Sequence, residues 1–119
     1  MNNYRRGKFA ELLATLYMLC HGYRIIGRNY ITGRGTKAGE IDLICHKQHT
    51  LVFMEIKQRQ TAEKAAYAIS RTQQQRIIRG AQSFIKLHPQ YKNDDIQFDA
   101  VLIALPFDIR HIKNAWTAD

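Results

Sequence analysis

The chain has 119 residues, of which 45% are hydrophobic, 10% aromatic and 24% charged. This composition supports one hydrophobic core, so a single domain over residues 1–119 is predicted, and it excludes a largely disordered chain. Eighteen lysines and arginines against ten acidic residues give a net charge of +8. That charge favours a polyanionic partner, nucleic acid above all, although a basic surface can also serve solubility alone.

The first residues lead directly into an amphipathic helix, without the continuous apolar stretch of a secretion signal or a membrane span. The two cysteines, Cys20 and Cys45, lie inside apolar patterns and are predicted to be buried, reduced thiols. Both observations predict a cytoplasmic protein that does not enter a membrane.

The first predicted elements are a helix from Tyr4 to His21 and a short β-type segment from Tyr23 to Tyr30. The predicted core-facing side of the helix consists of Phe9, Leu12, Leu13, Leu16, Tyr17, Leu19 and Cys20. The stretch from Thr32 to Gly39 is rich in glycine and includes Arg34 and Lys37. It is predicted to be a basic loop.

Two strand patterns follow, Glu40 to His46 and Thr50 to Lys57, joined by a polar turn. A helix capped by its first residue is predicted from Ser70 to His88. An apolar strand, Gln97 to Leu105, and a last short segment, Ile109 to Asn114, complete the chain. The predicted order is αβββαββ, and the predicted fold class is α/β with a central mixed sheet flanked by helices.

The two central strands are predicted to form a hairpin in which Asp42 faces Glu55 and Glu40 faces Lys57. Because side chains alternate along a strand, these four residues share one face and the other face is uniformly apolar. The apolar face is predicted to hold Ile41, Leu43, Cys45, Val52, Met54 and Ile56. Two directly opposed carboxylates repel each other by roughly 0.2–1 kcal/mol as an exposed pair, so a cation is expected between them.

A hard divalent cation such as Mg²⁺, or Mn²⁺, suits Asp42 and Glu55, because it takes one or two carboxylate ligands and keeps waters for a phosphate. Lys57 could then hold or deprotonate an attacking water, or stabilise charge on the phosphate. These groups meet the needs of phosphodiester hydrolysis. The alternative is an exposed hairpin end, where Lys57 pairs with Glu40 and Asp42 as surface ions worth less than about 1 kcal/mol.

Four short motifs carry a family resemblance. They are GKFAE at residues 7–11, GEIDLI at residues 39–44, LVFMEIK at residues 51–57 and FDAV at residues 98–101. In this order they resemble the YraN-like family, a bacterial branch related to Holliday-junction resolvases within the PD-(D/E)xK nuclease superfamily. The resemblance covers most of the chain.

This resemblance implies a restriction-endonuclease-like fold. Within that fold Asp42 and Glu55 bind metal, Lys57 is catalytic, and Glu11 reaches the site from the first helix. The helical pattern alone leaves two interpretations for Glu11, which lies at the edge of the apolar side and could equally be a solvated residue.

Basic and amide side chains supply the predicted DNA-binding surface. They are Arg34 and Lys37 in the basic loop, Arg59 after the hairpin, and Arg71, Gln75, Arg76 and Arg79 on the second long helix. Arginine forks and amides donate to phosphate oxygens, although a plain solvated face explains the helical residues equally well. Some relatives place a polar active-site group at the position of Gln75. His46 and His49 are predicted to be exposed turn residues.

The sequence therefore predicts a Mg²⁺-dependent endonuclease acting on DNA, with branched or flapped DNA as the expected substrate class. The alternative is a non-catalytic nucleic-acid-binding module with a nuclease-like fold, and a third interpretation is a basic accessory domain for an acidic protein partner. A homodimer would follow if the substrate were a four-way junction, because two symmetric strands need two sites.

Overall fold

The computed structural model describes residues 2–32, 39–59, 69–104 and 108–118. In chain order the elements are α1 (Asn3–Cys20), β1 (Arg24–Thr32), β2 (Gly39–Lys47), β3 (Thr50–Arg59), α3 (Arg71–Leu87), the 3₁₀ turn η2 (Pro89–Tyr91), β4 (Asp95–Ala104) and β5 (Asp108–Trp116). The predicted order αβββαββ is confirmed, with the η2 turn as an addition to it. The predicted basic loop with Arg34 and Lys37 lies outside the described residues.

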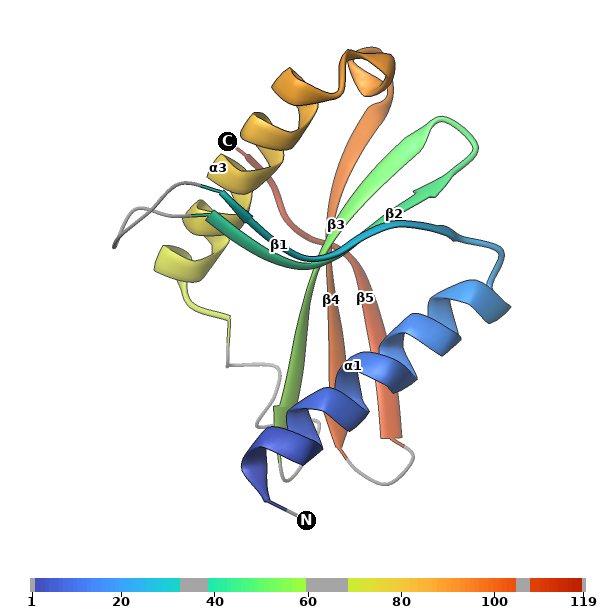
Figure 1. Ribbon diagram of the computed structural model, residues 1–119, viewed down its shortest axis with the longest axis vertical. Coiled ribbons are helices and arrows are strands. Elements are labelled where there is room, and N and C mark those ends of the chain that lie inside the picture. Colours follow the sequence, from blue (N-terminus) through green and yellow to red (C-terminus); the bar gives the residue numbers. More distant parts are fainter. Residues whose placement is uncertain (1, 33–38, 60–68, 105–107, 119) are drawn as a thin grey trace.

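The five strands form one sheet in the order β1-β2-β3-β4-β5. β3 and β4 are parallel, whereas the other neighbouring strands are antiparallel. α1 crosses one face of the sheet and α3 lies against the other, so two hydrophobic clusters enclose the strands (Figure 1). In the part of the chain that the structure describes, no helix is both long and apolar enough to span a bilayer.

Local signals set the beginning of each helix. Asn2 caps α1, because its side-chain oxygen accepts a hydrogen bond from the backbone N of Arg5 at 2.9 Å. At the start of α3, Ser70 Oγ accepts from the backbone N of Gln73 at 3.1 Å, and the Gln73 side chain accepts from the backbone N of Ser70 at 3.3 Å. This reciprocal cap fixes the first turn of α3.

α1 buries a different side from the predicted one. Ala10, Ala14 and Met18 pack against the sheet and are almost fully buried, whereas Leu12 and Leu16 are 47% and 48% exposed. The prediction is confirmed for Leu13 and Tyr17, which pack against this cluster. It is wrong for the exposed residues Phe9, Leu12, Leu16, Leu19 and Cys20. Small alanine side chains let the helix backbone lie close to the strands, which a row of leucines would prevent.

The two cysteines therefore differ in burial. Cys20 lies on the outward side of α1 and is exposed, so the prediction that it is buried is wrong. Cys45 in β2 is buried as predicted, and that burial, helped by the charge of Asp99, raises the pKa of its thiol to about 12. The Cys45 thiol therefore stays protonated at neutral pH and is unreactive.

β2 and β3 pair over only part of their length. The ladder runs from Lys47 opposite Thr50 to Leu43 opposite Met54, in the register of the predicted hairpin. Beyond this point β3 continues beside β4 as far as Arg59, whereas β2 turns away, and the two strands part like the arms of a fork (Figure 1). We call the space between these two arms the fork.

Side-chain alternation is lost where β2 leaves β3. Ile41 is predicted to lie with Leu43, but it joins Ile44 and Phe53 in the cluster beneath α3, and Leu43 belongs to the cluster beneath α1. The prediction for Ile41 is therefore wrong. Past Leu43 the strand β2 is paired with β1 but no longer with β3, and here it turns so that Ile41 packs against α3.

Two glycines allow that contact. A Cβ on Gly39 would lie 2.7 Å from the Cα of Gly80 and 2.7 Å from Thr32 Oγ1, which is closer than atoms can pack. Gly39→Ala is therefore expected to push β2 away from α3 and to lower the free energy of unfolding by roughly 1–3 kcal/mol. Denaturant unfolding monitored by circular dichroism measures this change.

Gly7→Ala is the matched control for Gly39→Ala. Gly7 lies inside α1, and nothing is within 4 Å of the position of its added Cβ. Because alanine favours a helix over glycine, this substitution is expected to raise the free energy of unfolding by roughly 0.5–1 kcal/mol. Equal stability of the two variants would show that β2 and α3 are not in close contact.

A fully bonded carboxylate holds β4 to β5. Asp99 is completely buried, with His111 Nε2 2.7 Å from its Oδ2 and the backbone N of Asn114 donating to its Oδ1 at 3.0 Å. Gln97 Nε2 also donates to Oδ1 at 3.0 Å. Asp99 thus anchors the irregular pairing between these strands, and we assign it a structural role.

His46 is a further departure from prediction. Its Nε2 lies 2.7 Å from Asp94 Oδ2, and both side chains are 16% exposed, so His46 is a partly buried partner rather than an exposed turn residue. His49, in the turn itself, is exposed as predicted. The His46 contact joins the β2–β3 hairpin to the segment before β4.

Candidate active site

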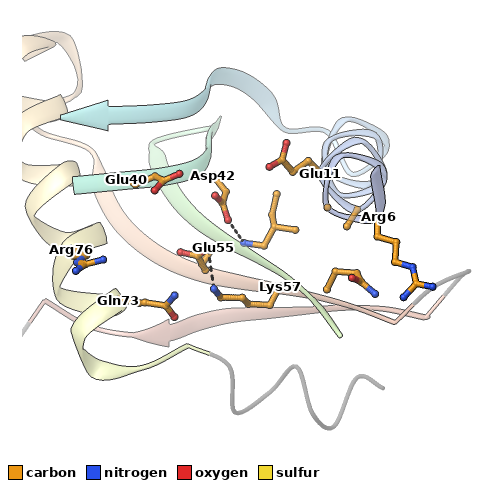
Figure 2. A pocket seen from close by; sticks show the side chains of 12 residues that line it. Arg6, Glu11, Glu40, Asp42, Glu55, Lys57, Gln73 and Arg76 are labelled. Carbon is orange, nitrogen blue, oxygen red and sulfur yellow. Dashed lines mark hydrogen bonds and ion pairs between the residues drawn. The ribbon is translucent and has the colours of Figure 1, made fainter. Parts of the chain in front are cut away.

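Asp42 lies where β2 leaves β3. Its Oδ2 accepts a hydrogen bond from the backbone N of Ile56 at 2.9 Å, so the carboxylate takes the place of the missing ladder partner (Figure 2). A carboxylate held by the main chain has a fixed position, unlike a solvated acid on a surface strand. The fork thus holds the Asp42 carboxylate in a fixed position.

Glu55 and Lys57 project from β3 into the same fork. Lys57 Nζ lies 3.8 Å from Glu55 Oε1, and the two side chains are only 14% and 13% exposed. Figure 2 shows Glu55 between Asp42 and Lys57. Burial of all but a small part of these two side chains excludes the alternative of an exposed hairpin end.

The pKa of the Glu55 carboxyl is raised to about 9, mainly by burial. Its hydrogen bond to Asp42 and the charges of Asp42 and Glu40 contribute to this rise, whereas the charge of Lys57 opposes it. The predicted repulsion between opposed carboxylates is thus relieved at neutral pH by a proton on Glu55. A divalent cation would relieve it as well, by displacing that proton.

Glu55→Gln is expected to change how stability depends on pH. The pKa of Glu55 rises from an ordinary 4.5 to about 9 on folding, so wild type loses stability as the pH rises between these values, where the unfolded state has lost its proton. Glutamine cannot titrate, and its amide can donate to Asp42 as the protonated acid does. The variant should gain at least about 2 kcal/mol relative to wild type between about pH 5 and pH 8.

Denaturant unfolding at the two pH values, without divalent cations, measures this gain. Glu40→Gln is the control, because Glu40 lines the same pocket but is exposed, and it removes the same charge without removing a buried acid. If wild type and Glu55→Gln lost stability in parallel, Glu55 would not be protonated in the folded protein.

Glu11 reaches the pocket from α1. Its Oε2 is buried and makes no hydrogen bond, but it forms an ion pair with Lys8 Nζ at 3.5 Å. Figure 2 shows the Glu11 carboxylate on the side of the pocket near Asp42. A buried carboxylate oxygen without a hydrogen bond can still accept one from a water or bind a cation.

The fork opens into a cavity of about 660 Å³. Its lining comes from α1, β2, β3 and the first turns of α3: Arg6, Gly7, Ala10, Glu11, Glu40, Asp42, Glu55, Ile56, Lys57, Gln58, Gln73 and Arg76. The acids and Lys57 occupy the centre, with Arg6 on one side and Gln73 and Arg76 on the other (Figure 2). Cationic side chains thus flank an acidic centre.

The structure places the other predicted DNA-binding residues elsewhere. Arg71, Gln75 and Arg79 are exposed on α3 and do not line the pocket. Arg59 ends β3, and its side chain lies outside the described part of the structure. Gln73 takes the place in the pocket that the resemblance gives to Gln75.

The sequence indicates a binding role for the helix surfaces that carry Gln73 and Arg6, but it does not place either residue in the pocket. The capping box at Ser70 could have pointed to Gln73, because a side chain at that position of the first turn lies at the helix end. Arg6 has a weaker signal, a basic residue in the first turn of a helix, where the dipole disfavours positive charge.

The residues in the fork fit a divalent cation of the Mg²⁺ class. Among the described residues, no three His, Cys, Asp or Glu side chains stand close enough to form a complete protein cage. Mg²⁺ does not need one, because it keeps several waters and binds through one or two carboxylates and a substrate phosphate. Asp42 and Glu55 would supply these carboxylates, and Glu11 lines the same pocket.

The fold and the position of the fork together give this protein a restriction-endonuclease-like architecture. A five-stranded mixed sheet between two helices, in the order αβββαββ, has the predicted restriction-endonuclease-like architecture. The fork, with its two acids and a lysine, lies where β2 and β3 part.

The chain belongs to the family described as "Uncharacterised protein family UPF0102", whose model matches residues 10–103. It is 41% identical over 115 residues to a UPF0102 protein of Rhodopseudomonas palustris strain BisB18, covering 97% of this chain and 82% of that relative. A UPF0102 protein of Nitrobacter winogradskyi is 39% identical, with 97% and 94% covered. One of Paramagnetospirillum magneticum is 40% identical over 116 residues, with 97% and 89% covered. The predicted YraN-like membership is confirmed.

Proposed function

We propose that this protein is a Mg²⁺- or Mn²⁺-dependent nuclease that hydrolyses phosphodiester bonds in DNA. One observation carries the proposal: Asp42 and the largely buried Glu55 are hydrogen-bonded to each other in the fork, with Lys57 Nζ 3.8 Å from Glu55. Burying two acids and a lysine together costs stability, and carboxylates with shifted pKa values in a pocket are typical of catalytic sites. A cytoplasmic location, where DNA and Mg²⁺ are both present, is part of the proposal.

Each central side chain has a distinct role in the proposed reaction. Asp42 and Glu55 hold the cation, and the hydrogen bond from Ile56 keeps Asp42 in place. A bound Mg²⁺ neutralises the phosphate and makes water more acidic. Lys57 holds the attacking water against the phosphate, and its positive charge stabilises the charge that develops there. Glu11 orients a further water.

The shape of the pocket favours DNA in which one strand separates from its duplex. α1 and α3 contribute Arg6 and Arg76 on opposite sides of the acids, where they can bind the phosphates next to the cleaved one (Figure 2). A recess between two helices admits a single strand more readily than an intact duplex. This favours branched or flapped DNA as substrate.

Arg76→Ala is expected to weaken DNA binding by roughly tenfold, because an arginine on a phosphate contributes on the order of 1–3 kcal/mol. Arg79→Ala is the matched control, since Arg79 lies on the same helix but is exposed away from the pocket. Fluorescence anisotropy with a flapped DNA and Ca²⁺ in place of Mg²⁺ measures both. Equal losses in the two variants would mean that DNA binds along the outer side of α3.

A panel of linear, flapped and four-way-junction DNAs tests the proposed function. With Mg²⁺ or Mn²⁺, wild type should cut at least one of them. Salt-sensitive binding without cutting would instead establish a non-catalytic nucleic-acid-binding module. Absence of any preference for DNA over other polyanions would favour a basic accessory domain for an acidic protein.

A further inference from the structure

The outward side of α1 is an apolar stripe. It consists of Phe9, Leu12, Leu16 and Leu19, which are 37%, 47%, 48% and 49% exposed. No charged residue lies between Leu12 and Cys20. Among the described elements, none packs over this side of α1, which faces away from the sheet (Figure 1).

α3 shows what a solvent-facing helix of this protein normally looks like. Its exposed residues include Arg71, Gln75, Arg76 and Arg79, and its apolar residues Ile77 and Phe84 point into the core. α1 reverses this pattern, because alanines face the sheet and leucines face outward. A row of exposed leucines in a chain with charge +8 indicates a surface that another molecule covers.

The spacing of the stripe identifies a helix as the covering element. Its residues follow one another at intervals of three, four and three positions, which is the spacing of the seam between two packed helices. The intervals are the same in either chain direction, so two copies of the stripe can pair in antiparallel orientation. In an antiparallel pair of α1 helices, Leu12 of one copy would lie opposite Leu16 of the second copy, and Phe9 opposite Leu19.

Charge favours the antiparallel orientation. The first turn of α1 has no acidic residue and carries exposed Arg5 and Arg6. A parallel pair would bring these two basic ends together. An antiparallel pair places each beside the carboxyl end of the other helix, where Lys47 Nζ already donates to His21 O at 2.8 Å, so that two arginines face one lysine instead of two further arginines. Because the stripe itself has no charge, closing it buries no unpaired ion.

We propose that the stripe is the interface of a homodimer formed by two antiparallel α1 helices. The proposal does not depend on nuclease activity, because the stripe does not line the pocket. From α1 the pocket is lined by Arg6, Gly7, Ala10 and Glu11. The dimer therefore leaves both pockets open.

Sedimentation velocity over a range of concentrations tests the interface with wild type, Leu12→Glu and Leu16→Glu. We expect wild type to reach twice the chain mass of 13.9 kDa and each variant to dimerise at least about tenfold more weakly. Leu87→Glu is the control, because Leu87 is 67% exposed at the end of α3 and the same substitution there should leave the dimer unchanged. Circular dichroism spectra establish that each variant is folded.

Cysteine cross-linking tests the orientation. In a Cys20→Ser background, a mixture of Leu12→Cys and Leu16→Cys chains should form disulfides mainly between unlike chains. Bridges mainly between like chains would overturn the antiparallel arrangement. A wild type that stays monomeric at every concentration would overturn the interface itself. This conclusion would hold even if the monomer bound vesicles of anionic phospholipid through the stripe.

Discussion

Lys57→Met should lower the single-turnover rate of DNA cleavage by about 10²–10⁴-fold while the protein still binds divalent cations. Lys57 is 14% exposed and lies 3.8 Å from Glu55 Oε1, so its ammonium group stands beside the proposed cation ligands without being one of them. Methionine fills a similar volume without the charge, which removes the group that holds the attacking water. Rapid-quench kinetics with excess protein measure the rate, and Mn²⁺ titration calorimetry measures metal binding.

Lys86→Met controls for the loss of one positive charge elsewhere. Lys86 is an exposed residue in the last turn of α3, outside the pocket. Its replacement should leave the cleavage rate within about threefold of wild type, because surface charge alone changes mainly the encounter with DNA. If both lysine variants were slowed equally, Lys57 would act through net charge and not in the chemical step.

Asp42→Asn should weaken metal binding and abolish cleavage, with the fold retained. An asparagine oxygen can still accept the hydrogen bond that Ile56 N now gives to Asp42 at 2.9 Å, so the arms of the fork should stay in place. The amide is a poor ligand for Mg²⁺, however, and Mn²⁺ affinity should fall by at least about tenfold, or about 1.4 kcal/mol. Calorimetry, circular dichroism and the cleavage assay together measure these effects.

Asp108→Asn provides the control for Asp42→Asn. Asp108 is an exposed acid at the start of β5, 3.5 Å from Arg110 and outside the pocket. The Asp108→Asn substitution should leave metal binding and cleavage unchanged. A Mn²⁺ affinity that is the same in wild type and in Asp42→Asn would place the cation away from the fork.

Much of the fold could be predicted, because its local signals agree with one another. The cap at Ser70, the two central strands and the register of their hairpin all follow from short-range patterns. The two acids and Lys57 could be placed together for the same reason. A strand alternates over every two residues, so a register fixed near the turn carries along to Glu55.

The wrong predictions concern residues whose burial or orientation is set by tertiary packing. Hydrophobicity predicts that the leucine side of α1 is buried, but close approach to the sheet favours Ala10 and Ala14. Alternation predicts the direction of Ile41, but β2 leaves its partner before that residue. The docking of α3 selects Gln73 over Gln75 for the pocket. In each case the deciding contact joins elements distant in the sequence.

The central claim is that the fork binds a divalent cation and uses Lys57 to cleave DNA. Its most direct test is single-turnover cleavage of a flapped DNA by wild type and Lys57→Met, both stripped of metal with EDTA and then supplied with Mg²⁺ or Mn²⁺. We predict that metal restores cleavage by wild type and leaves Lys57→Met at least about a hundredfold slower. Wild type that binds the DNA but does not cut it with either metal, or a variant that cuts as fast, would contradict the claim.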